Sequence, residues 1–212
     1  MNIIRRPFRY RNDNAVFILI GLNILVYLAE LFFKNQYVVR YLSMIPLAII
    51  RGGWIWQFVT YMFVHDPNSI SHILFNMLAL FIFGHQLERH MGTREFLLYY
   101  FLTGILAGFF SFVVYWLTGQ WLTALMGASG AIFAVQLAFA TLFPNSVIYI
   151  WGILPLRAPV MVLGFTGLEL VLMITGLGGN VAHITHLAGF AFGWLYFVVR
   201  FGINPWRAMR RR

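Results

Sequence analysis

The sequence predicts an all-α, polytopic membrane protein with six transmembrane helices, and three observations support this prediction. Of the 212 residues, 61% are hydrophobic and only 10% are charged, whereas a soluble domain is roughly 45–50% apolar and about 25% charged. The mean hydropathy is +0.78. Six apolar segments alternate with polar or turn-rich stretches. A soluble fold of this size could not cover itself with so few polar side chains.

The six apolar segments are the candidate transmembrane helices. They lie at residues 15–33, 70–87, 96–117, 129–143, 158–175 and 182–201. The first segment lacks a small-residue cleavage site, so we expect it to remain as an anchor and not to be removed as a signal peptide. An even number of spans puts both termini on one side of the membrane.

The basic residues favour the cytoplasm for that side. The formal net charge is +9, and with cytoplasmic termini only Lys34, Arg40 and Arg51 of the fifteen Lys and Arg lie outside, as the positive-inside rule requires. No aromatic residues alternate with the arginines in a base-binding pattern, so we expect the lipid bilayer and no nucleic acid as a partner. The expected organisation is a basic cytoplasmic N-terminus, a six-helix domain and a basic cytoplasmic C-terminus, at residues 1–14, 15–203 and 204–212.

Two segments depart from simple spans. The first outer loop, residues 34–69, is long and apolar, so we expect it to associate with the membrane, with Trp54 and Trp56 at the headgroup level. The fourth span has about 22 Å of helix against a hydrocarbon core of roughly 30 Å. Residues 121–128 must then enter the bilayer as non-helical chain, which is tolerated only where it is buried in protein or lines a wet cavity. We therefore expect a hydrated pocket at the start of the fourth helix.

Ser129 opens this short helix in the sequence Gly127-Ala128-Ser129-Gly130. A serine at this position is most often an N-cap, which accepts a hydrogen bond from the second or third backbone N–H. The same unpaired N–H groups are suited to hold an oxyanion beside the serine hydroxyl.

His186 lies near the outer end of the sixth span and shares a helix face with Gly189 and Gly193. The Gly-x-x-x-Gly spacing favours close packing of membrane helices, and the fourth helix offers a small face at Gly130, Ala134 and Ala138. Packing these faces together would bring His186 close to Ser129.

His72 and Asn76 are four residues apart on one face of the second span. Together they are able to donate hydrogen bonds to a shared anion. The alternative is that they hold helices together, a common role of Asn in membranes.

Metal binding and transport are the other interpretations of the polar residues. His183, His186 and His72 are potential zinc ligands, but the chain has no Cys and its six acidic residues lie apart from these histidines in sequence, so we expect no metal and no other cofactor. Glu169, a carboxylate inside the fifth span, is typical of a transporter. It would equally fit a residue hydrogen-bonded inside the bundle or facing a cytoplasmic crevice.

Four motifs, in order over about residues 56–193, resemble the rhomboid family of intramembrane serine proteases. They are the family's His-x-x-x-Asn at His72 and Asn76, a Gly followed by Glu-x-x-x-Gly at Gly84, Glu88 and Gly92, Gly-x-Ser-Gly at Gly127 to Gly130, and His-x-x-Gly-x-x-x-Gly at His186, Gly189 and Gly193. The resemblance implies a six-helix rhomboid bundle with a long membrane-associated first outer loop. The short termini match the minimal prokaryotic form, so we expect a plasma-membrane location.

The resemblance also implies site roles. Ser129 is the nucleophile and His186 the general base, in a dyad without an aspartate. The oxyanion is met by His72, Asn76 and the backbone N–H groups of Ser129 and Ala128, and Phe133 packs against the His186 ring, while Gly127, Gly130, Gly189 and Gly193 support the packing. The implied substrates are single-pass membrane proteins, cut near the outer end of their span.

The sequence departs from the family at two points. His183 is a second histidine that competes for the base role, although the spacing to the glycines favours His186. The first outer loop has Trp56-Gln57 where the family often has Trp-Arg. A catalytically inactive client-binding relative and a small-solute transporter stay as alternatives. We also expect the glycine-rich loop 176–180, together with the fifth span, to move when a substrate enters, so that prolines at Gly178 and Gly179 slow turnover.

Overall fold

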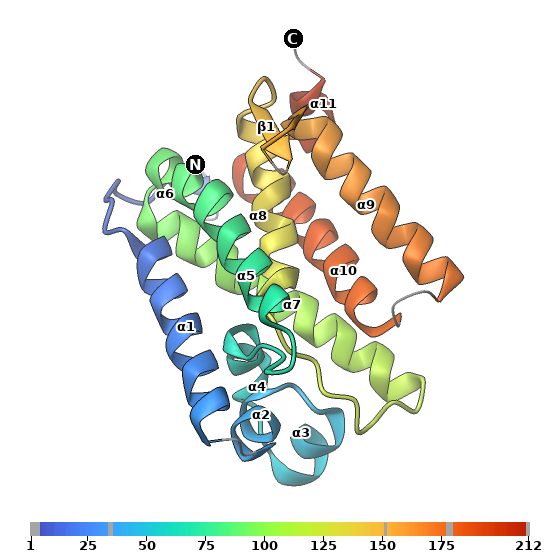
Figure 1. The fold of residues 1–212 in the computed structure, drawn as a ribbon. Coiled ribbons are helices and arrows are strands. Elements are labelled where there is room, and N and C mark those ends of the chain that lie inside the picture. The colour runs from blue at the N-terminus through green and yellow to red at the C-terminus, as the bar shows by residue number, and fades with distance from the viewer. Residues whose placement is uncertain (1–4, 34–35, 151, 177–179, 211–212) are drawn as a thin grey trace.

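The computed structural model describes residues 5–33, 36–150, 152–176 and 180–210. Long helices dominate the fold (Figure 1). They are α1 (Ala15–Phe33), a second span made of α5 (Ile70–Ala79), the π-helical turn η3 (Leu80–Gly84) and α6 (His85–Met91), then α7 (Thr93–Leu117), α8 (Ser129–Leu142), α9 (Ala158–Thr175), and α10 (Asn180–Tyr196) with the π-helical turn η4 (Phe197–Phe201). The expected all-α, multi-span fold is thereby confirmed.

The lengths of these helices divide them into two groups. Five are long and apolar enough to cross a membrane, and α8 is a shorter apolar helix of 14 residues, about 21 Å long. Most of α8 is buried, because Ala131, Ala134, Ala138 and Ala140 let neighbouring helices approach. Figure 1 shows α8 inside the bundle, with α1 and α9 on opposite flanks.

Helix α8 packs on α10 through glycines. A Cβ atom on Gly189 would lie 1.9 Å from the carbonyl oxygen of Gly130, and one on Gly193 would lie 3.0 Å from Cβ of Ala134. Side chains at these two positions would therefore push the helices apart. The expected small-residue contact between the fourth and sixth spans is present.

The first outer loop is folded into short helices. They are α2 (Gln36–Leu42), α3 (Pro46–Gly52), α4 (Gln57–Thr60) and the 3₁₀ turn η2 (Tyr61–Phe63). The buried Gln57 side chain ties them together: its Oε1 accepts from the Ile45 N–H at 3.0 Å, and its Nε2 donates to the Arg40 and Tyr41 carbonyls at 3.1 and 3.2 Å. Trp54 and Trp56 stack, with ring centroids 5.7 Å apart.

The chain between α7 and α8 is non-helical and pairs with this loop. Backbone N–H and carbonyl groups of Met44 and Leu125 bond to each other at 3.0 and 2.9 Å, and the Leu47 N–H donates to the Trp121 carbonyl at 2.9 Å. These bonds satisfy backbone groups that have no helical partner. The non-helical entry expected before the fourth helix is present.

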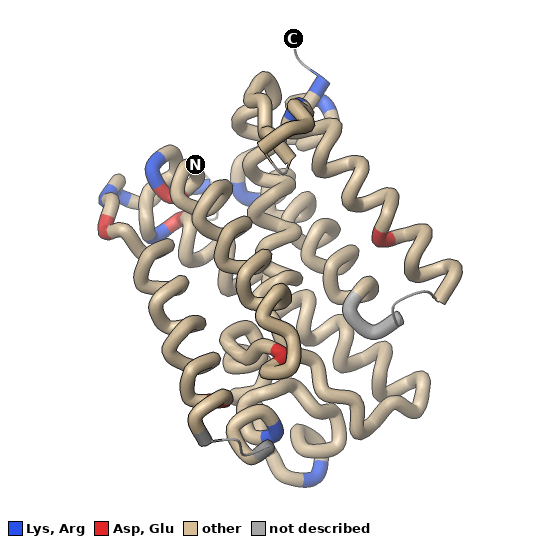
Figure 2. The backbone as a smooth tube through the Cα atoms, in the orientation of Figure 1, with Lys and Arg blue, Asp and Glu red and all other residues tan. Residues whose placement is uncertain are grey.

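Charges collect at the two ends of the bundle. Figure 2 shows Lys and Arg gathered at the end that carries both termini, and basic residues also lie at the opposite end, where Arg40 belongs to α2 and Arg51 to α3. At the terminal end, the Glu88 carboxylate accepts from the Ala15 and Val16 N–H groups at 2.7 and 2.9 Å and so caps α1. Glu95 forms a bidentate pair with Arg200, with distances of 2.8 and 2.6 Å.

Two small elements were not expected from the sequence. Strands β1 (Val147–Ile150) and β2 (Leu154–Arg157) form an antiparallel hairpin between α8 and α9. A short helix, α11 (Pro205–Met209), follows the last span, with the Asn204 side chain accepting from the Arg207 N–H at 3.3 Å. The expected hinge positions Gly178 and Gly179 lie outside the described residues.

Candidate active site

Ser129 is the first residue of α8, where the chain turns from extended backbone into helix. Gly127 has a φ of +113°, a conformation that side-chain-bearing residues rarely adopt, and its N–H donates to the Tyr61 carbonyl at 2.9 Å. The helix ladder begins with the Ile132 N–H, which donates to the Ala128 carbonyl at 3.0 Å. The N–H groups of the first turn therefore have no intrahelical acceptor.

His186 of α10 lies directly beside Ser129. Its Nε2 is 2.7 Å from the Ser129 Oγ, and its ring stacks on Phe133 with centroids 4.5 Å apart and planes 9° from parallel. Stacking holds the ring in one plane, and the 2.7 Å contact is within range for transfer of the hydroxyl proton. The structure thus brings together three residues that the sequence separates by up to 57 positions.

His72 and Asn76 stand on the neighbouring α5. The Asp66 backbone N–H donates to the His72 Nδ1 at 3.3 Å, so the proton of a neutral His72 ring belongs on Nε2. A Cβ atom on Gly127 would lie 2.8 Å from that Nε2, which shows that the nitrogen points at the start of α8. The Asn76 Nδ2 donates to the His72 carbonyl at 2.8 Å and has a second N–H left for another acceptor.

A cavity of about 810 Å³ joins these groups. Its lining includes Ser129, His186, His72, Asn76 and Glu169, together with the Gly127 and Phe133 positions. Polar groups from α5, α8, α9 and α10 therefore converge on one space within the bundle, which is how ligand sites are built.

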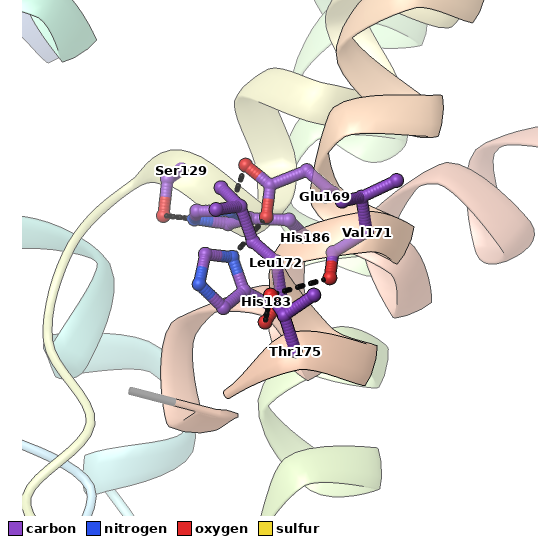
Figure 3. Close-up of polar contacts among 7 residues, drawn as sticks. All are labelled: Ser129, Glu169, Val171, Leu172, Thr175, His183 and His186. Atoms are coloured by element: carbon purple, nitrogen blue, oxygen red, sulfur yellow. Dashed lines mark hydrogen bonds and ion pairs between the residues drawn. The ribbon is translucent and has the colours of Figure 1, made fainter. Parts of the chain in front are cut away.

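Glu169 is the acidic member of the site, and sequence reasoning did not place it there. Its Oε1 lies 3.0 Å from the His186 Nδ1 and its Oε2 lies 2.5 Å from the His183 Nδ1 (Figure 3). The sequence signal was a carboxylate in an apolar span, which is a functional candidate by default. Separation along the chain therefore does not keep an acid away from the two histidines.

Glu169, His183 and His186 also form a compact donor set. One ligand atom from each lies within 4.8 Å of the others, and imidazole with carboxylate is a set that zinc accepts. In the same arrangement the His186 Nε2 is already engaged by Ser129. The ring is also placed without an ion, since the Ser129 Oγ lies 2.7 Å from Nε2 and the Glu169 Oε1 lies 3.0 Å from Nδ1.

His65 lies behind the cavity wall, in the first outer loop. Its ring is fully buried and packs edge-on against His72, with centroids 5.0 Å apart. Burial, together with the nearby His72, lowers the pKa of His65 to about 4. The His65 ring is therefore neutral at pH 7.

Comparison with known proteins places these residues in a family. A model of the rhomboid domain matches residues 52–203. The putative rhomboid protease YdcA of Bacillus subtilis is 30% identical over 151 residues, which cover 70% of this chain and 68% of that protein. The rhomboid protease GlpG of Haemophilus influenzae is 30% identical over 131 residues, covering 61% and 63%.

A third relative is matched over more of the chain. The rhomboid protease AarA of Providencia stuartii is 28% identical over 205 residues, covering 84% of this chain and 69% of that protein. The chain spans about two thirds of the length of these three relatives. With its several membrane-spanning helices and a domain match over most of its length, the chain is an integral membrane protein that belongs to the rhomboid family.

Proposed function

We propose that this protein is an intramembrane serine endopeptidase that cleaves transmembrane segments of single-pass membrane proteins near their outer end. The observation that carries the proposal is the 2.7 Å contact between the Ser129 Oγ and the His186 Nε2, in a cavity within a membrane bundle. A serine needs an adjacent base to become a nucleophile, and His186 meets that need.

The proposed reaction has two halves. The Ser129 Oγ attacks the scissile carbonyl carbon while its proton passes to the His186 Nε2, and the resulting oxyanion is held by donors from His72, Asn76 and the first N–H groups of α8. The intermediate collapses, the C–N bond breaks and His186 returns the proton to the leaving amine. Water, with His186 again as the base, then hydrolyses the acyl-enzyme.

The substrate class is proposed from the same geometry. A membrane helix hides its carbonyl groups in backbone hydrogen bonds, so a substrate segment must unwind before Ser129 reaches it. Segments with Gly, Ser or Pro near the cut unwind most readily. We further propose that both termini face the cytoplasm of a prokaryotic cell and that residues 15–203 form the protease domain.

Cleavage in a bilayer tests the proposal. Purified wild type and Ser129→Ala are reconstituted into liposomes with a labelled single-pass substrate, and a fluorophosphonate probe is applied to both in parallel. We expect the wild type to cleave the substrate and to be labelled at Ser129, with both signals absent from Ser129→Ala. Equal cleavage by the two proteins contradicts the assignment of Ser129.

Two further comparisons refine the assignment. His186→Ala should abolish cleavage and labelling, because the serine loses its base, whereas His183→Ala should keep part of the activity. EDTA should leave cleavage unchanged, because no step uses a metal. A wild type that binds the substrate, resists the probe and does not cleave would instead be a client-binding protein.

A further inference from the structure

The carboxylate of Glu169 is the one charged group of α9 that reaches the site. It lies between two imidazoles, 3.0 Å from the His186 Nδ1 and 2.5 Å from the His183 Nδ1. The three side chains are 13%, 15% and 10% exposed. Figure 3 shows Glu169 extending from α9 to both rings, with Ser129 on the other nitrogen of His186.

The position of Glu169 is costly for a carboxylate. Ionisable residues inside membrane spans are expensive and are normally paired. Among the described residues, the ion-pair partners of Glu169 are the two histidines and no Lys or Arg. Glu95, the buried carboxylate at the other end of the bundle, has the permanent cation Arg200 as its partner. A carboxylate whose only counter-charges are imidazoles is most stabilised when one of them is protonated.

The two nitrogens of His186 have different partners. To accept the hydroxyl proton of Ser129, the Nε2 must be free of hydrogen, so the neutral ring must carry its hydrogen on Nδ1. That nitrogen lies 3.0 Å from the Glu169 Oε1, an ion-pair contact that is not aligned as a hydrogen bond, so Glu169 acts on the ring through its charge. Other titratable groups near the ring are His183 on α10 and His72 and Asp66 on the opposite wall of the cavity.

We infer that Glu169 is a positioning residue for His186. The Glu169 carboxylate favours the His186 tautomer that carries its hydrogen on Nδ1, and it stabilises the imidazolium formed when Ser129 is activated. The His183 ring holds the second carboxylate oxygen of Glu169. This inference rests on the proposed serine protease function and extends the Ser-His pair to a Ser-His-Glu arrangement. Phe133 sets the plane of the ring, and Glu169 sets which of its nitrogens carries the proton.

The first test is the isosteric variant Glu169→Gln, assayed in liposomes against wild type across pH. We expect kcat to fall roughly 10- to 100-fold, at or below the lower end of the effect of a general acid or base itself, with KM changed less than about 2-fold. The acidic limb of the pH–rate profile should move to lower pH, because an uncharged neighbour no longer favours the protonated ring. A merely structural role of Glu169 would not move this limb.

Glu95→Gln is the matched control. It makes the same chemical change at a buried carboxylate and breaks the ion pair with Arg200, at a site outside the cavity lining. We expect its thermal stability to fall while its pH–rate profile stays that of wild type. A Glu169→Gln enzyme with wild-type kcat and profile, while Ser129→Ala is inactive, overturns the inference and leaves the proposed function intact.

A second measurement needs no change at Glu169. In wild type labelled with ¹⁵N-histidine, the His186 ring signal is identified by its loss in His186→Ala. We expect the neutral ring to carry its hydrogen on Nδ1, and hydrogen on Nε2 overturns the inference. If the wild type neither cleaves the substrate nor reacts with the fluorophosphonate, both the proposed function and this inference are wrong.

Discussion

Gly189 is the residue at which α10 touches α8, and the absence of a side chain there sets the distance between Ser129 and His186. A Cβ atom would meet the Gly130 carbonyl oxygen at 1.9 Å, which is backbone and is unable to move aside alone. The serine is one residue before Gly130 and the histidine is three residues before Gly189. Any separation of the helices at this point is therefore transmitted directly to the Ser129–His186 contact.

Gly189→Ala should consequently impair both stability and cleavage. We expect the free energy of unfolding to fall by about 1–3 kcal/mol from overpacking, and kcat to fall as the Ser129–His186 distance grows. Gly167→Ala on α9 is the control, since a Cβ there meets nothing within 4 Å. Thermal unfolding and liposome cleavage of the two variants measure the difference, and equal behaviour contradicts the packing argument.

Asn76 provides a second residue-level prediction. Asn76→Ala should lower kcat by about 10²–10³, the usual value of one oxyanion donor, and so by less than Ser129→Ala. Asn23→Ala is a matched control, because Asn23 also donates to the carbonyl four residues earlier on its own helix, at 2.8 Å. If both variants lose the same activity, Asn76 serves only helix stability.

The sequence predicts a contact between two side chains only where helix periodicity determines which faces of the two helices meet. The Ser129–His186 contact was predictable because Gly130 and Gly189 put small faces on the two helices that carry the pair. The Glu169 contact was not, because nothing in the period of an apolar helix fixes its rotation or depth against a neighbour. Nothing in the sequence therefore indicated that Glu169 lies beside His183 and His186.

At the scale of elements, Gln57 explains how the first outer loop is held without the family's Trp-Arg pair. One amide group bonds three backbone groups that lie 12 to 17 residues away. An amide is suited to this because it both donates and accepts, whereas a guanidinium only donates. The first outer loop is thereby stabilised by hydrogen bonds between its own residues.

Gln57→Leu should loosen this loop. Removing the amide leaves the part-buried Ile45 N–H and Arg40 carbonyl short of a partner, whereas the Tyr41 carbonyl still accepts from the Trp56 ring N–H at 3.0 Å. Each such loss costs up to about 1–3 kcal/mol when the group is buried, so the thermal midpoint should fall. Gln120→Leu is the control, since within the described part of the chain the Gln120 amide donates to the exposed Thr118 hydroxyl and to no other group. Circular dichroism during heating in detergent compares them, and an unchanged midpoint for Gln57→Leu would show that the loop is held elsewhere.

The long elements were predictable and the short ones were not. Apolar length defined all six main helices to within a few residues. The hairpin carried only half of the usual signal, because Val147–Ile150 is rich in β-branched residues whereas Leu154–Arg157 has none and contains a proline. The short helices of the first outer loop depend on contacts such as those of Gln57, which local sequence does not show.

At the scale of the whole molecule, His65 makes stability depend on pH. Its pKa is about 4 when folded and near 6.5 when unfolded, so between these values the unfolded state binds more protons. Stability therefore falls as the pH drops from 6.5 to 4, by at most about 3 kcal/mol. His65→Leu should remove this part of the dependence, as chemical unfolding at pH 7 and pH 4.5 would measure. If the variant and the wild type lose the same stability between pH 7 and pH 4.5, the assignment of this pH dependence to His65 is wrong.

Orientation is the other whole-molecule prediction. The chain has no Cys, so a single introduced thiol reports its own exposure. With cytoplasmic termini, Arg51→Cys should react in intact cells with a maleimide that does not cross membranes, and Arg207→Cys only after permeabilisation. The reverse pattern would invert the proposed topology.

The placement of Glu169 on α9 has a thermodynamic consequence. The same helix contributes Phe165 and Leu168 to the cavity wall, and only 22% of it is buried inside the bundle. If α9 is displaced when a substrate enters, as we expect from the sequence, the Glu169 carboxylate is withdrawn from His186, so that opening and the proposed activation of the base would oppose each other. Thermodynamic linkage makes the coupling reciprocal. A condition that stabilises the His186 imidazolium also stabilises the closed position of α9. If the proposed roles of Ser129, His186 and Glu169 hold, an open bundle would be chemically idle, and bond cleavage would begin when α9 returns over a bound segment.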